Sequence, residues 1–143
     1  SYKGIIPRII VEPLLLDTGG KLPRDYKFFC YDGDVKYVYV VSERETSYYM
    51  DFFDLSWNWL PIRFGYKNSP NPPTRPEKLA EMAEVAHKLS TGFPFVRVDL
   101  YSIPDVYFGE MTFYPQGGCV AITPEEWDLR LGSHMSTSSF IRN

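Results

Sequence analysis

The sequence has 143 residues, 44% of them hydrophobic and 17% aromatic, which suffices for one globular domain but is short for a complete two-substrate enzyme. Its formal net charge of −3 is spread without basic blocks, which argues against a nucleic-acid partner. No apolar run approaches the roughly 20 residues that span a bilayer, and the N-terminus lacks the order of a signal peptide, so we expect no membrane span and a cytoplasmic location.

The first half of the sequence predicts mainly strands. Ile9 to Leu16 is an apolar, β-branched run closed by a turn sequence, and it predicts a strand buried on both faces. The segments Asp25 to Tyr31 and Val35 to Val41 flank an Asp-Gly pair, which predicts a hairpin. Residues 45–75 mix aromatic residues with turn formers and prolines, and they predict a long irregular excursion with one or two short strands.

The second half predicts both helices. An amphipathic pattern that starts at Pro76 and ends near Ser90 predicts the only long helix. Phe93 to Tyr101 and Val106 to Tyr114 predict two neighbouring antiparallel strands. Thr123, as an N-cap before a proline, predicts a short final helix. The predicted fold class is α+β, a mostly antiparallel sheet with one long helix and a short C-terminal helix.

Charged residues recur at alternate positions of the last two predicted strands. This alternation places Arg97 and Asp99 on one face of the first strand, and Glu110 and Thr112 on one face of the second. Ionised groups between such apolar flanks need partners or a metal, and magnesium commonly takes one or two protein carboxylates plus water and phosphate oxygens. The spacing alone also allows a different reading, in which Arg97 simply pairs with the two acids on a half-exposed sheet.

Five segments carry a family resemblance. They read I-I-V-E-P-L-L, D-Y-K-F-F-C-Y-D-G-D-V-K, S-T-G-F-P-F-V-R-V-D-L-Y, Y-F-G-E-M-T-F-Y-P and T-P-E-E-W-D-L-R-L-G. In this order and spacing they resemble the TupA-like ATP-grasp proteins of bacterial surface-polysaccharide biosynthesis, over nearly Ile6 to Gly132. The resemblance implies ATP and Mg²⁺ as cofactors and a small-molecule or saccharide substrate.

The resemblance also implies roles for the alternating residues. Asp99 and Glu110 fall on the two metal carboxylates of the family, and Arg97 falls on its catalytic, phosphate-binding arginine. Thr112 occupies the third metal-ligand position, where the superfamily usually has asparagine. A hydroxyl is a poorer ligand than an amide carbonyl, which leaves a second metal ion in doubt.

Four further residues are implied to bind the nucleotide. The backbone groups of Glu12 and Leu14 resemble the hinge that reads adenine, because Pro13 between them has no N–H. Asp17 is expected at a ribose hydroxyl, although a turn-forming aspartate is at least as consistent with its sequence. Lys27 resembles the basic position that faces the triphosphate, and a solvated strand lysine is the alternative.

Two other features have simpler explanations than function. His87 lies late in the predicted helix, where an imidazole favours the negative end of the helix dipole or the edge of the core. Tyr48, Tyr49, Trp57 and Trp59 could form a sugar-stacking platform, but packing in a core or lid explains them as well. Cys30 and Cys119 lack metal-type spacing and predict buried thiols.

Residues 1–132 are therefore expected to form the hinge and the C-terminal ATP-grasp subdomain, and residues 133–143 a disordered or tag-derived tail. The N-terminal ATP-grasp subdomain is expected in the parent protein, upstream of Ser1, so that this chain is a partial, inactive ligase. The resemblance implies attack of a carboxylate on ATP, giving an acyl phosphate that an amine or similar nucleophile captures. A non-catalytic carbohydrate-binding or scaffold module and a glycosyltransferase are the alternatives.

Overall fold

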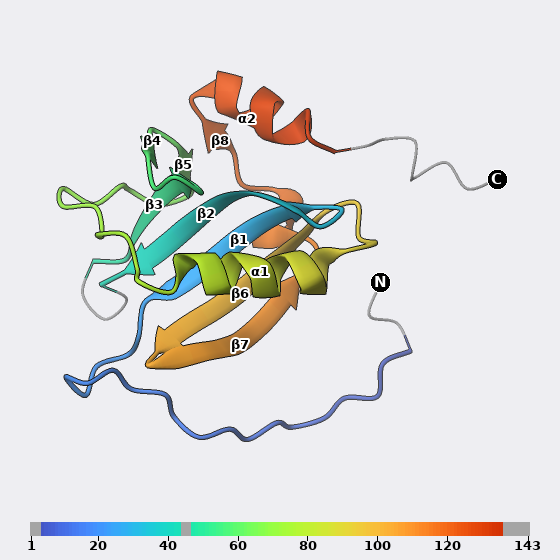
Figure 1. The fold of residues 1–143 in the computed structure, drawn as a ribbon. Helices are drawn as coiled ribbons and strands as arrows, with labels where there is room; N and C mark the ends of the chain where they lie inside the picture. Colours follow the sequence, from blue (N-terminus) through green and yellow to red (C-terminus); the bar gives the residue numbers. More distant parts are fainter. Residues whose placement is uncertain (1–3, 44–46, 136–143) are drawn as a thin grey trace.

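The computed structural model describes residues 4–43 and 47–135. Its centre is a six-stranded antiparallel sheet in the order β4-β3-β2-β1-β6-β7 (Figure 1). These strands span Asp25–Tyr31 (β1), Asp34–Ser42 (β2), Tyr49–Asp54 (β3), Trp59–Leu60 (β4), Val96–Ile103 (β6) and Asp105–Thr112 (β7). Two helices and a two-stranded ribbon complete an α+β fold of the predicted class.

The predicted Asp-Gly hairpin is confirmed and provides the centre of the sheet. β1 pairs with β2 along its whole length, and the turn between them has positive φ at both Asp32 (50°) and Gly33 (84°). Such a turn matches the right-handed twist of the two strands. Because β1 pairs with β6 on its other side, it links the hairpin to the strand that carries Arg97 and Asp99.

One face of the sheet is covered by helix α1, Leu79–Ser90 (Figure 1). Leu79, Met82 and Ala86 are at most 2% exposed and pack against the apolar side chains of β1, β2 and β6. The helix begins at Leu79 rather than at the predicted Pro76. A turn in which the Leu79 N–H donates to the Pro76 carbonyl comes first, so the proline precedes the helix instead of opening it.

The opposite face carries an aromatic cluster. Phe29, Tyr39 and Phe52 pack with Phe64, and ring centroids lie 4.9–6.4 Å apart. The cover consists of a ribbon of β5 (Arg63–Phe64) and β8 (Ile122–Thr123) and helix α2, Glu125–Gly132. The predicted final helix is thus confirmed, but it begins one residue later than expected, with extended Pro124 as its N-cap.

The excursion over residues 45–75 contains more strand than predicted. β3 is a six-residue strand paired with β2, and β4 and β5 follow it. Within β3, Met50, Phe52 and Phe53 are at most 2% exposed. The turn formers on both sides of this short strand obscured its alternating pattern in the sequence. Pairing with β2 stabilises it as part of the sheet.

The predicted strand from Ile9 to Leu16 is wrong. Residues 5–16 have no strand or helix, and they lie apart from the sheet (Figure 1). Ile9 is 95% exposed and Leu14 73% exposed. The apolar run satisfies the side-chain pattern of a buried strand, but a strand also needs a hydrogen-bonded neighbour and a covering layer. Within the described residues, this segment has neither.

The expected tail falls largely outside the described residues, since residues 136–143 are not among them. His134, just before them, packs its ring against Tyr31 and Tyr37, with Nε2 3.0 Å from the Tyr37 hydroxyl. Cys30 is buried as predicted, but Cys119 is exposed, because it follows a short turn outside the core. Neither helix of the described chain is long and apolar enough to cross a membrane.

Candidate functional site

Four polar side chains form one register row across neighbouring strands. Lys27 of β1 is paired with Tyr39 of β2 on one side and with Asp99 of β6 on the other, and Asp99 is paired with Glu110 of β7. Directly paired residues point to the same face of a sheet. The row therefore lies on the face opposite α1, beside the aromatic cluster, where the predicted convergence of Asp99 and Glu110 is found.

Arg97 joins the acids of this row. Its Nε and Nη2 atoms donate to the two carboxylate oxygens of Asp99, both at 2.7 Å, in a two-point pair. Nη2 also donates to Glu110 Oε1 at 2.7 Å and to Thr112 Oγ1 at 2.8 Å. Because one nitrogen contacts both carboxylates, the nearest oxygens of Asp99 and Glu110 are separated by no more than two hydrogen-bond lengths.

Lys27 brings a second cation to the same acids. Its Nζ lies 2.7 Å from Asp25 Oδ2 and forms a salt bridge and hydrogen bond with Asp99 Oδ2. The Lys27 side chain is 11% exposed, and those of Asp25 and Asp99 are 4% and 1% exposed. Lys27 is therefore part of the site and not the solvated strand lysine that the sequence also allowed.

These five charged side chains form a charge cluster whose charges nearly balance. Two cations, Lys27 and Arg97, face three acids, Asp25, Asp99 and Glu110, which leaves one negative charge. Burial raises the pKa of Asp99, and the hydrogen bonds and positive charges of Arg97 and Lys27 oppose that rise. Burial also acts upward on the pKa of Glu110, but the hydrogen bond from Thr112 and the charge of Arg97 outweigh it and lower that pKa.

A glycine lets the two metal-type acids approach. Gly109 lies in a bulge where the register between β6 and β7 shifts after the Asp99–Glu110 pair. A Cβ atom at Gly109 would lie 3.1 Å from the Asp99 carbonyl oxygen and 3.1 Å from the Tyr101 ring. A side chain at Gly109 would require the Asp99 backbone or the Tyr101 ring to shift by a few tenths of an ångström.

Four of the five residues of the charge cluster line a cavity of about 440 Å³, and neither Arg97 nor Thr112 is among its lining residues. Asp25, Lys27, Asp99 and Glu110 form its charged wall. Glu12, Pro13 and Leu15, from the exposed N-terminal segment, line it together with residues of β7. The structure thus brings the predicted hinge residue Glu12 to the predicted phosphate and metal residues, although 15 residues separate Glu12 from Lys27 in the sequence.

The cavity offers two carboxylates as metal ligands. In the described part of the chain, no three His, Cys, Asp or Glu side chains form a group that could hold a metal ion. Asp99 and Glu110 both line the cavity, and Thr112 Oγ1 lies 2.9 Å from Glu110 Oε1. Two carboxylates with room for water and phosphate are the usual protein share of a Mg²⁺ site.

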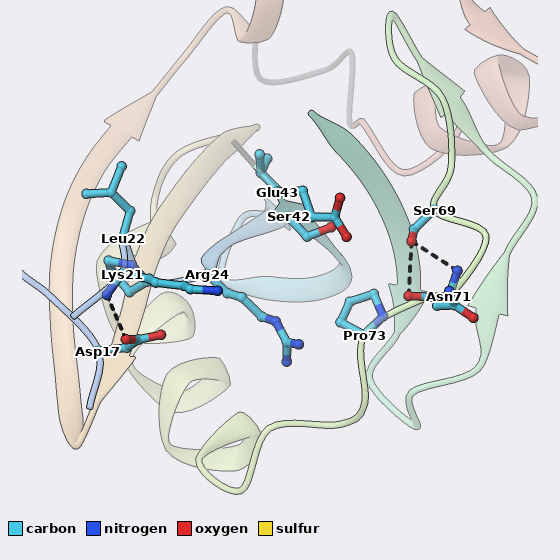
Figure 2. Close-up of a pocket in the computed structure, with 11 residues that line it drawn as sticks. Asp17, Lys21, Leu22, Arg24, Ser42, Glu43, Ser69, Asn71 and Pro73 are labelled. Atoms are coloured by element: carbon cyan, nitrogen blue, oxygen red, sulfur yellow. Dashed lines mark hydrogen bonds between the residues drawn. The ribbon is translucent and has the colours of Figure 1, made fainter. Parts of the chain in front are cut away.

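Asp17 and Leu14 are not brought into this cavity. Leu14 is not among the residues that line it. Asp17 Oδ1 accepts hydrogen bonds from the N–H groups of Gly19 and Lys21 at 2.8 and 2.9 Å, as a turn-forming aspartate does. Asp17 lines a different pocket of about 460 Å³, where Lys21 and Arg24 face the loop of Ser69 and Asn71 (Figure 2).

The features with simpler explanations mostly have structural roles. His87 Nδ1 lies 2.7 Å from the Gly33 carbonyl oxygen and ties α1 to the hairpin turn. Trp57 stacks on Phe53 with centroids 4.3 Å apart, and Tyr48 packs on Tyr66 at 4.3 Å. Trp59, at 43% exposure, donates its ring N–H to Asp51. These contacts favour a role in internal packing for the aromatic residues, rather than a continuous platform on which a sugar could stack.

Sequence reasoning missed two residues that contact the predicted site residues. Asp25 is two residues before Lys27 on the same strand, so period-2 alternation could have found it. Tyr39, whose hydroxyl accepts a hydrogen bond from Arg97 Nη1 at 3.0 Å, gave no such signal. Its role depends on the order β2-β1-β6, which places residues 58 positions apart on one face.

Comparison with known proteins identifies a family. The family model described as TupA-like ATPgrasp matches residues 1–136. No curated protein and no solved structure matches the chain. The matched range contains every residue of the charge cluster and both helices, so the chain belongs to the TupA-like ATP-grasp family.

Proposed function

We propose that this chain carries the magnesium and nucleotide-phosphate half of an ATP-dependent carboxylate ligase that acts in cell-surface polysaccharide biosynthesis. Membership of an ATP-grasp family supports an ATP-dependent, ligase-like role, and ATP-grasp proteins in general bind ATP with Mg²⁺. The observation that carries the proposal is the convergence of Asp99 and Glu110 on one cavity, where a single nitrogen of Arg97 contacts both carboxylates.

Asp99 and Glu110 would hold the metal ion. When bound, Mg²⁺ supplies positive charge at the phosphate oxygens and at the oxygens that become charged during transfer. Thr112 would contribute its hydroxyl directly or through water. The cluster without a metal has one excess negative charge, which favours a cation, and a bound Mg²⁺ would make the total positive and so favour an anionic phosphate.

Arg97 and Lys27 would bind the phosphates. The Nε–Nη2 edge of Arg97 is paired with Asp99, so Arg97 would act on a phosphate mainly through its positive charge, from a position that is fixed before the phosphate arrives. Lys27 lines the same cavity as a point charge. Glu12 lines it from the hinge side, where its backbone carbonyl would meet the adenine edge. Leu14 and Asp17 lie outside this cavity, so the proposal gives them no contact with the nucleotide.

The proposed reaction is phosphoryl transfer followed by acyl transfer. A substrate carboxylate oxygen attacks the γ-phosphorus of ATP and ADP leaves, which gives an acyl phosphate. An amine or similar nucleophile then attacks the acyl carbon and releases phosphate. Arg97 would stabilise the negative charge that develops in both steps.

A non-catalytic carbohydrate-binding or scaffold module is the second candidate. The aromatic residues of positions 48–66 suggested it, but most of them pack within the molecule, as shown by Trp57 on Phe53. A thermal shift separates the candidates, since Mg-ATP would stabilise a ligase and an oligosaccharide alone would stabilise a binding module. A glycosyltransferase would instead prefer a sugar nucleotide over ATP in direct competition.

The test is phosphate release from ATP by the full-length gene product, measured with and without Mg²⁺. We expect Asp99→Asn and Glu110→Gln to lose at least about 100-fold in rate, as loss of a metal ligand or its charge typically does. Asp51→Asn is the matched control, because Asp51 is equally buried but bonds Trp59 and Ser69 outside the cluster. Wild-type rates in both cluster variants would rule out the proposal.

A further inference from the structure

Arg97 is hydrogen-bonded both to the proposed metal-binding residues and to a residue outside that set. Four of its five side-chain hydrogen bonds go to Asp99, Glu110 and Thr112, which form the proposed metal-binding set. The fifth runs from Nη1 to the hydroxyl of Tyr39, at 3.0 Å. Tyr39 is therefore the one bonded partner of Arg97, among the described residues, that lies outside that set.

The Tyr39 ring is well fixed. It is 1% exposed, and it packs at 4.9 Å from the Phe52 ring centroid, at 5.6 Å from Phe29 and at 6.3 Å from Phe64. A ring held on several sides leaves its hydroxyl little freedom. Burial raises the pKa of Tyr39, so the hydroxyl stays neutral and able to accept the Arg97 hydrogen bond throughout the physiological range.

A cation bound by Asp99 and Glu110 would compete with Arg97 for their oxygens. The bonds from Arg97 to those acids would then weaken or be shared, because the oxygens would also be ligands of the metal. The Tyr39 bond carries no such competition. It can keep the guanidinium in place while the acids serve the metal.

From this asymmetry we infer that Tyr39 is a positioning residue, the metal-independent anchor that holds the Arg97 guanidinium toward the phosphate. This inference rests on the proposed function, since it assigns Tyr39 a purpose within the same site. The inference goes beyond the proposed function, because the proposed function includes no contact of Tyr39 with the metal or the nucleotide. The hydroxyl acts only through Arg97.

Tyr39→Phe removes the hydroxyl and keeps the packed ring. In the full-length gene product we expect about tenfold weaker binding of Mg-ATP by calorimetry, because a hydrogen bond to a charged group is lost where its position matters. Tyr37→Phe is the matched control. Tyr37 lies two residues away on the same strand and face, but its hydroxyl bonds His134 instead of Arg97. Its Mg-ATP affinity should equal that of the wild type.

A readout without nucleotide separates positioning from general loosening. The rotation of the Arg97 guanidinium, followed by nitrogen NMR of the free protein, should quicken in Tyr39→Phe and stay unchanged in Tyr37→Phe. In an Arg97→Lys background, which removes Nη1, the change at Tyr39 should have no further effect on Mg-ATP affinity. This cycle compares the Arg97→Lys variant with the double variant that also carries Tyr39→Phe. A loss of affinity that comes only from general destabilisation by Tyr39→Phe would appear in this background too, so the cycle detects it.

The outcomes distinguish this inference from the proposed function. If Asp99→Asn abolishes Mg-ATP binding while Tyr39→Phe binds like Tyr37→Phe, the site is real and Tyr39 is not its anchor. If Tyr39→Phe weakens binding equally in the wild type and in the Arg97→Lys background, the effect does not act through Arg97, and the inference is wrong. If Asp99→Asn binds Mg-ATP like the wild type, the proposed function itself fails.

Discussion

Arg97 is the residue on which the buried acids most depend. Asp99 is 1% exposed, and both of its oxygens accept hydrogen bonds from Arg97. A buried carboxylate that loses a cation keeps its desolvation penalty, and without Arg97 only Lys27 would remain to offset that of Asp99. An exposed ion pair gains and loses little. The same guanidinium therefore matters to the fold before any ligand is bound.

Arg97→Met should lower the free energy of unfolding by about 3 kcal/mol or more, as removal of one partner of a buried pair does. Lys88→Met is the control, because Lys88 and Glu84 form an exposed pair and its loss should cost at most about 0.5 kcal/mol. Urea unfolding at pH 7 measures both. A loss below about 1 kcal/mol for Arg97→Met would show that Lys27 alone suffices for Asp99.

The buried thiol of Cys30 should make the stability of the fold depend on pH. Burial raises the pKa of the Cys30 thiol from 9.0 to about 11, while Cys119 is exposed. A raised pKa means that the folded state favours the neutral thiol. This contribution to stability is fully present below pH 9 and declines as the pH rises through about 11.

The difference in unfolding free energy between wild type and Cys30→Ala should therefore narrow by about 2 kcal/mol between pH 9 and pH 11. Taking the difference cancels the contribution of every other titrating group, because the two proteins share all of them. Denaturant unfolding at each pH measures it. A difference independent of pH would show that the thiol ionises equally easily in the folded protein.

At the scale of elements, the β1–β2 turn is fixed by a glycine. Gly33 has φ of 84°, and a Cβ there would lie 3.0 Å from Thr91 Oγ1 and 3.3 Å from His87 Nδ1. Gly92 has nearly the same φ, 85°, but a Cβ there meets nothing within 4 Å. A comparison of substitutions at the two glycines therefore distinguishes the cost of backbone strain, present at both, from the cost of steric crowding, present only at Gly33.

Gly92→Ala should cost about 1 kcal/mol from the left-handed backbone alone. Gly33→Ala should cost at least about 1 kcal/mol more, because the new methyl group also displaces the end of α1. Thermal or urea unfolding of both variants measures the difference. Equal losses would mean that Thr91 and His87 move aside freely, and that the contact between turn and helix contributes little.

Local patterns predicted the elements that are locally determined. The Asp-Gly hairpin and the amphipathic helix both follow from short-range turn chemistry and periodicity, and both are present. The Ile9 to Leu16 strand failed because side-chain pattern says nothing of a pairing partner. β3 was underestimated for the opposite reason, since its partner β2 stabilises a strand whose flanking turn formers hide it.

The same distinction applies to the site. Alternation within β6 and β7 was enough to bring Arg97, Asp99, Glu110 and Thr112 together. Tyr39 could not be predicted, because it reaches Arg97 through the order of three strands rather than through the spacing of one. The exposure of the apolar segment before β1 could not be predicted either, because the periodicity of a segment does not show whether another part of the protein covers it.

At the scale of the whole molecule, the charge cluster lies between a packed domain and an unpacked segment. Residues 5–16 expose several large aliphatic side chains, yet Glu12, Pro13 and Leu15 of this segment line the cavity of the cluster. A segment with few buried contacts opens easily, whereas the sheet with its two covered faces opens only with global unfolding.

Among the described residues, brief digestion with trypsin should therefore cut first in this segment, after Arg8. Ile9, on the other side of that bond, is 95% exposed. Cleavage after Arg97, which is 7% exposed in a central strand, should be negligible over the same time. Mass spectrometry of early time points identifies the cuts. Protection of the Arg8 bond would show that the segment packs against something in solution.

The central claim is that the carboxylates of Asp99 and Glu110 together bind the cation that accompanies ATP. Its most direct test is the Mg²⁺ dependence of ATP binding to the full-length gene product, titrated for wild type, Glu110→Gln and the exposed control Glu125→Gln. We predict that Mg²⁺ strengthens ATP binding in wild type and control, and that this gain falls at least about tenfold in Glu110→Gln. An equal gain in all three proteins would contradict the account.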